Sequence, residues 1–219
     1  VGATMAISSH LTLLTGIAGI NVYIVRILKL PFDISLHFYF FFFVGVIITG
    51  ILKMFFYSSV GAGFLGTLGS SALLYVSIHW IILGNTINIP LLYIQGLLLG
   101  FGASMTLVSG SMATLLDGDL KEAAQRSQTM HTIRNFSAAM LIPIIAYTIK
   151  NHIQKGTQSI YAENITDKMI YLKKLQDVAI DADHQIFLLM IIFNMVMFVS
   201  SIIQMILGKG RRITPPRES

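Results

Sequence analysis

The segment that decides the fold occupies residues 96–139 and reads GLLLGFGASMTLVSGSMATLLDGDLKEAAQRSQTMHTIRNFSAA. An apolar stretch dotted with glycine leads into a short charged loop, and a second apolar stretch follows with Arg134 inside it. We interpret the two stretches as membrane helices joined by a tight loop. A guanidinium near the centre of a span costs on the order of 3–10 kcal/mol or more, so its neighbours usually provide a water-filled cavity or a partner.

The composition places the whole chain in the membrane class. Hydrophobic residues make up 54% of the 219 residues and charged residues 11%, whereas soluble domains carry about 25% charged residues. The stretch from Lys53 to Asp117 contains no other charged residue and is far longer than the ~20 residues of one span. Because the chain begins at Val1 inside an apolar segment, we expect it to be part of a longer polypeptide.

Hydropathy predicts six membrane-spanning helices, which we place at residues 1–27, 36–57, 59–83, 91–115, 129–149 and 185–207. The chain then divides into the first five spans (1–149), a polar link (150–183), the last span (184–208) and a basic tail (209–219). Apolar residues recur in the link at helical spacing, which predicts an amphipathic surface helix there; they are Ile165, Met169, Leu172, Leu175 and Ala179. The positive-inside rule puts both termini and the 116–127 loop in the cytoplasm and the link outside.

Arg134 is the first candidate for a substrate-binding residue, together with His131 and Asn135. It lies about eight residues into its apolar stretch, or roughly 12 Å along the helix axis. A cavity-facing guanidinium would bind an anionic group or hold a gating pair. The alternative is a structural role, in which Arg134 extends to the cytoplasmic surface or bonds to helix ends. His131 shares the face of Arg134, and Asn135 shares it less closely.

Polar residues of the first and fourth spans complete the candidate site. Ser9, His10 and Asn21 lie in the first span and Ser104 in the fourth. One interpretation is a polar face along a substrate pathway. The alternative is that the hydroxyls bond their own backbone or a neighbouring helix, as they often do in membranes.

The chain offers no catalytic or cofactor-binding motif. GAGFLG at 61–66 fits the dinucleotide-binding pattern, but no acidic residue follows before Asp117, so we interpret these glycines as helix-packing residues. Asp181, Asp183 and His184 stand at the entrance of a span, where we expect solvated charge rather than a metal site. We predict no enzyme activity, no cofactor, no metal and no nucleic-acid partner. Proton coupling would require an acid elsewhere, or His10 or His131 in its place.

Two segments of the chain resemble the C-terminal half of a major facilitator superfamily transporter. IPLLYIQGLLLGFGAS (89–104) and AAQRSQTMHTIRNFSAA (123–139) are similar to late helices of the fourteen-helix drug:proton antiporters. The matching positions are Gln95, Gly96, Gly100, Gly102 and Arg134. Two departures stand out: Gly50-Ile51-Leu52-Lys53 lacks the acid of the family's state-locking loop, and Ser137 and Ala138 replace a glycine.

The resemblance implies an all-α membrane protein whose six helices form two inverted three-helix repeats. It implies a half-transporter in the bacterial inner membrane, with spans one and four lining the cavity and an N-terminal half as partner, in the same chain or as a subunit. Proton-coupled multidrug efflux of a small molecule is the family default. The alternative is a non-transporting membrane scaffold or assembly subunit derived from a half-transporter.

Overall fold

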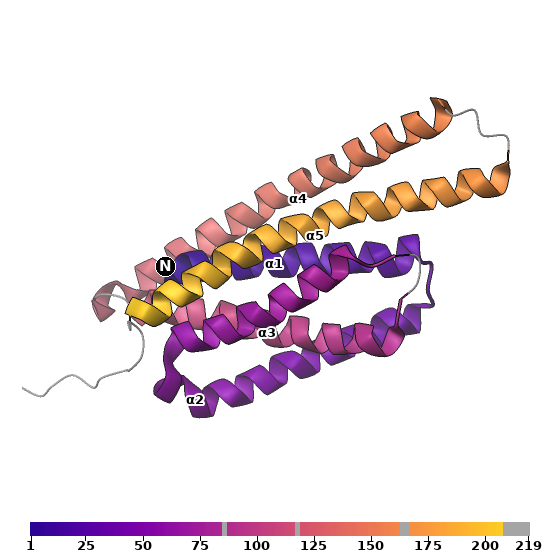
Figure 1. Cartoon of the computed structure of the whole chain (residues 1–219). Coiled ribbons are helices and arrows are strands. Elements are labelled where there is room, and N and C mark those ends of the chain that lie inside the picture. Colours follow the sequence, from indigo (N-terminus) through magenta and orange to yellow (C-terminus); the bar gives the residue numbers. More distant parts are fainter. Residues whose placement is uncertain (85–86, 117–118, 163–166, 208–219) are drawn as a thin grey trace, which may run out of the picture.

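The computed structural model describes residues 1–84, 87–116, 119–162 and 167–207, which are all-helical and contain no strand. Figure 1 shows five long helices arranged side by side along one direction, and each is long and apolar enough to cross a membrane. The helices are α1 (Gly2–Asn21), α2 (Phe32–Ile81), α3 (Ile89–Leu116), α4 (Ala123–Ala162) and α5 (Lys168–Leu207), with a π-helix η1 (Val22–Ile27) continuing α1 and a 3-10 turn η2 (Leu120–Glu122) before α4. The basic tail predicted at 209–219 lies outside the described residues.

Helix α2 folds back on itself at Gly61. This glycine has φ 79° and ψ 169°, which no helical residue adopts, and it separates the arms 32–60 and 62–81. The rings of Phe38 and Trp80 are 6.3 Å apart although a straight helix would separate them by about 63 Å. The reversal expected between the second and third spans is therefore made by one non-helical residue rather than by a loop (Figure 1).

Both arms of α2 pack closely against α3 because glycines remove the side chains between them. A Cβ on Gly100 would overlap the carbonyl oxygen of Phe42, and one on Gly45 would overlap that of Leu97. On the other arm, a Cβ on Gly69 would lie 2.9 Å from the carbonyl oxygen of Gly102. Small residues thus let the helix backbones touch, as is common between membrane helices.

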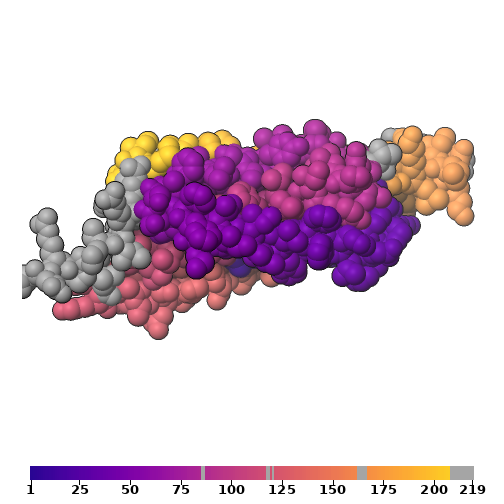
Figure 2. All heavy atoms as spheres, turned by 90° about the horizontal axis from the view of Figure 1, so that it is seen from below, coloured from indigo at the N-terminus to yellow at the C-terminus, as the bar shows by residue number. Residues whose placement is uncertain are grey.

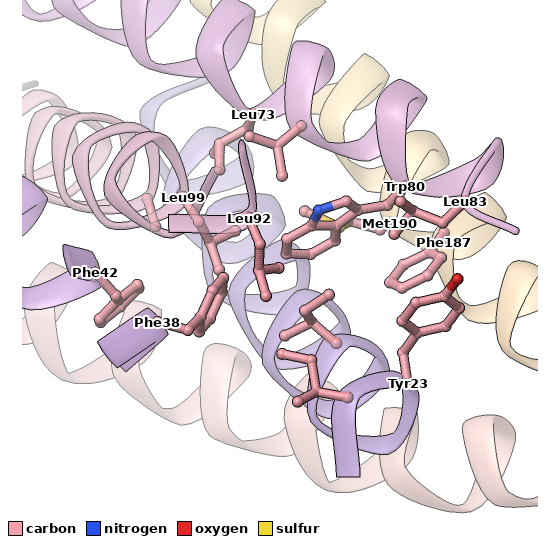
Figure 3. Close-up of a cluster of buried hydrophobic side chains, with 14 of the residues drawn as sticks. Tyr23, Phe38, Phe42, Leu73, Trp80, Leu83, Leu92, Leu99, Phe187 and Met190 are labelled. Carbon is pink, nitrogen blue, oxygen red and sulfur yellow. The ribbon is translucent and has the colours of Figure 1, made fainter. Parts of the chain in front are cut away.

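Buried polar side chains add hydrogen bonds between helices. Trp80 Nε1 on α2 donates to Gln95 Oε1 on α3 over 2.9 Å. Asn194 Nδ2 on α5 donates to the carbonyl oxygen of Leu73 at 3.2 Å and to the Ser77 hydroxyl at 3.1 Å, both on α2. Figure 3 shows Trp80 at the centre of the apolar cluster, with Phe187 of α5 and Tyr23 of η1 beside it.

The polar link expected at 150–183 differs from the prediction. Helix α4 continues to Ala162 and α5 begins at Lys168, so the described part of the link is two helix ends packed together, with Gly156 against Val178. No proline occurs between 150 and 183, so nothing separates the predicted amphipathic helix from the last span. At about 60 Å each, both helices project beyond the bundle (Figures 1 and 2).

Candidate functional site

Helix α4 is the least covered of the five helices. Only 6% of its most apolar window is buried, against 50% for α1 and for α3. It contacts α5 along one side and α1 near its beginning. Large apolar side chains on the rest of its surface are exposed, including Phe136, Met140, Ile142 and Tyr147. Such side chains suit lipid or a packed partner.

Three of the predicted site residues are polar and lie on one side of α4, within this otherwise apolar surface. His131 and Asn135 are exposed, and Arg134 between them is half-buried. Residues three and four apart are neighbours on a helix, so His131 adjoins both of the others. The Nε of Arg134 is buried and has no hydrogen-bond partner. Among the described residues, no acid lies within ion-pair distance of its guanidinium.

His10 of α1 lies close enough to Arg134 for the two side chains to interact electrostatically. His10 is half-buried and stands on the more exposed stripe of α1. The fold thus brings together two predicted residues that are far apart in sequence. A guanidinium and an imidazole on neighbouring helices can both donate hydrogen bonds to an anionic or polar group. We define His10, His131, Arg134 and Asn135 as the α1–α4 polar face.

The other three predicted residues do not join this face. The Ser9 side chain is buried between α1 and α3, where its hydroxyl donates to the carbonyl oxygen of Ala103 at 3.2 Å and lies 2.6 Å from the Thr106 hydroxyl. Ser104 is half-buried on α3, and its carbonyl oxygen accepts a hydrogen bond from Lys53 Nζ. Asn21 is exposed at the far end of α1. The Ser9 hydroxyl therefore bonds a neighbouring helix, which was the alternative to a role in a substrate pathway.

A cavity of about 470 Å³ opens next to the α1–α4 polar face, between the beginnings of α1 and α4 and the end of α3. Ile133, the neighbour of Arg134, lines it. Its charged rim is formed by Arg126, which donates to the carbonyl oxygens of Leu115 at 3.1 Å and Asp119 at 2.6 Å. The Glu122 carboxylate lies 3.5 Å from the same guanidinium. The remaining lining residues are Ala3, Thr114, Gln125, Thr129 and Met130.

Sequence reasoning was wrong about the surroundings of Asp183. This residue is 2% exposed rather than solvated, and neither carboxylate oxygen has a hydrogen-bond partner. The signal was present in the helical spacing, because Asp183 lies three residues after Ile180 and four before Phe187, both buried. Over the described residues, no group of three or more His, Asp or Glu could hold a metal ion.

Comparison with protein-family models, with curated proteins and with solved structures gave no match. The likeness to the major facilitator superfamily therefore rests on the motif residues of the sequence alone, such as Gln95, Gly100 and Arg134.

Proposed function

We propose that this chain is one half of a secondary transporter that moves a small amphipathic or anionic molecule across the bacterial inner membrane by alternating access. A second six-helix half would cover the α1–α4 polar face, and substrate would bind between the halves near the bilayer midplane. Within this chain, Arg134 and His10 would contact the substrate, with His131 and Asn135 beside them. Proton-coupled export is the direction that the resemblance favours.

The observation that carries the proposal is the polar side of α4. A helix whose other sides expose Phe136 and Ile142 is suited to lipid, but lipid cannot solvate a guanidinium, an imidazole and an amide at the same depth. Such residues persist at membrane depth where they line a water-filled cavity or meet another protein. Arg134 Nε, buried without a partner, is a donor to which an anionic substrate could bind.

The helix arrangement supports the same proposal. Counting the two arms of α2 separately gives six helical segments, the number in half of a major facilitator fold. Met5 near one terminus accepts a hydrogen bond from Ser201 near the other, at 2.9 Å, so both described ends lie at one end of the bundle. An even number of spans requires this, and the positive-inside rule would then make that end cytoplasmic.

The experiment that tests the proposal measures access of water to this face. The chain has no cysteine, so a single introduced cysteine can be labelled without background. We expect a membrane-impermeant maleimide to label Asn135→Cys roughly tenfold faster than Ile142→Cys in native membranes, because only a hydrated thiol ionises to the reactive thiolate. Equal and negligible labelling of both variants would contradict an aqueous pathway along α4.

The scaffold alternative is favoured by one contact. Lys53 Nζ donates to the carbonyl oxygen of Ser104, so the lysine ties α2 to α3 eight residues before the turn at Gly61. In the superfamily that this chain resembles, the corresponding basic residue belongs to a loop that locks one state. A scaffold would bury Asn135 against a partner and leave it unlabelled, which the same labelling experiment detects.

A further inference from the structure

We propose that Asp183 is a proton-binding site whose charge controls how η1 and the turn after α2 pack against α5. Its carboxyl group is the best-buried acid among the described residues, at 2% exposure, and both of its oxygens lack a partner. Burying a carboxylate without a hydrogen-bond partner costs free energy of folding. A bound proton, water or ion would remove this cost. Taking up one proton from solvent forms an O–H bond and leaves a neutral group.

The neighbours of Asp183 give its charge a structural consequence. Tyr23 of η1 is fully buried in the same apolar cluster as Phe187, four residues after Asp183, and its hydroxyl donates to the carbonyl oxygen of Gly84. The next residue, His184, shares a hydrogen bond of 2.8 Å with the carbonyl oxygen of Leu83. Both side chains therefore tie the turn after α2 to the site of the acid. A negative charge at Asp183 would attract water into this junction and loosen it.

The local geometry is that of an unusual helix end. Residues 22–27 form a π-helix, a wide turn that is rare and often found at functional sites. The turn places Tyr23 in the buried cluster with Phe187, which lies one helical turn after Asp183 (Figure 3). A proton fits better than a divalent metal, because a metal needs several ligands and no group of three or more His, Asp or Glu occurs among the described residues.

Other titratable groups at this end of the bundle could also respond to pH, so the experiment must separate them from Asp183. They include Tyr23 and Arg26 on η1, Lys29 just after it, His79 at the end of α2, Lys150 and His152 on α4, and Asp181 and His184 on α5. Asp181 is exposed and lies two residues from Asp183, which makes it a matched control.

Trp80 is a built-in reporter for the test. It is the only tryptophan of the chain, it is fully buried, and its ring centroid lies 5.3 Å from that of Phe187. Fluorescence of the purified full chain would be measured from about pH 4 to about pH 10. We expect a one-proton transition above about pH 5, where exposed aspartates are already ionised. Asp183→Asn should lose this transition, and Asp181→Asn should keep it.

A wild-type transition that survives in Asp183→Asn, or no transition at all, would overturn the proposal. A midpoint that moves with sodium concentration at constant ionic strength would also overturn it, in favour of a cation site. If Asp183→Asn does not fold, infrared spectroscopy of the wild-type chain decides the question. The carbonyl stretch of a protonated carboxyl must then be present near neutral pH. It must disappear over the same pH range as the fluorescence change. None of these readouts requires transport, so they are independent of the proposed function.

Discussion

Helices α3 and α4 have similar apolar spans but opposite positions in the bundle. α3 is enclosed by α1 and both arms of α2, and 50% of its most apolar window is buried, against 6% for α4. Both helices contain a stretch apolar enough to cross a membrane, and the difference in packing follows from their small residues. The glycines of α3 admit neighbouring backbones, as at Gly100 and Gly102, whereas the apolar part of α4 carries large exposed side chains and Arg134. Close backbone packing is therefore concentrated on α3, and exposed apolar side chains are concentrated on α4.

The largest effect on stability is expected at Gly100. Gly100→Ala should lower the free energy of unfolding by about 3 kcal/mol, because the new Cβ would overlap the Phe42 carbonyl, a backbone group that cannot rotate away. Gly50→Ala is the matched control, since a Cβ there meets nothing within 4 Å. It should be neutral or stabilise by up to about 1 kcal/mol through helix propensity. Thermal denaturation in detergent measures both, and equal midpoints would break the comparison.

A smaller effect is expected from the polar contact between α1 and α3. The Ser9 and Thr106 hydroxyls are 2.6 Å apart, and interhelical bonds of this kind average about 0.6 kcal/mol. A double-mutant cycle with Ser9→Ala and Thr106→Val should give a coupling energy of about that size. A coupling of zero would mean that Thr106 is satisfied by the carbonyl oxygen of Gly102 alone, with which it also makes a hydrogen bond.

The smallest effect on stability is expected at Arg134, where the largest effect on transport should appear. Arg134→Ala should change the free energy of unfolding by less than about 0.5 kcal/mol, because Nε has no partner to lose. It should abolish transport, and Arg134→Lys should restore part of it through the retained charge.

Arg126→Ala is the matched control on the same helix. Its guanidinium donates to two backbone carbonyls, so its loss should cost about 1–2 kcal/mol. A drop in protein abundance for Arg134→Ala like that for Arg126→Ala, measured by immunoblot of membranes, would make Arg134 a structural residue. That outcome would favour the scaffold alternative.

Because hydropathy is local, the sequence was sufficient to predict a chain of long apolar helices. It predicted six separate spans, whereas the structure has five long apolar helices, since residues 32–81 form one helix bent at Gly61. Charged and imidazole side chains are conspicuous in apolar stretches, so the sequence was enough to propose Arg134 and His10 as site residues, and their role stays a prediction. It could not show that the two lie within electrostatic range of each other, or that Ser9 faces α3, because both depend on how α1 is rotated in the bundle.

The polar segment around residues 150–183 was misjudged for a different reason. Hydropathy ends a span where polar residues begin, but a helix ends only where its backbone hydrogen bonds stop, and here they continue to Ala162. The burial of Asp183 follows from the same error. Because α5 is one continuous helix from Lys168, Asp183 lies on the same face as Ile180 and Phe187. That face is buried in the core.

The fold-back at Gly61 has a consequence for biosynthesis. Gly61 alone connects the two arms of α2, so no polar loop separates the first arm from the second. We therefore expect 32–81 to enter the bilayer as one helical hairpin. Only glycine tolerates φ 79° without strain, so a bulkier residue at position 61 would act first on the nascent chain and reduce yield before any effect on the mature protein could be seen.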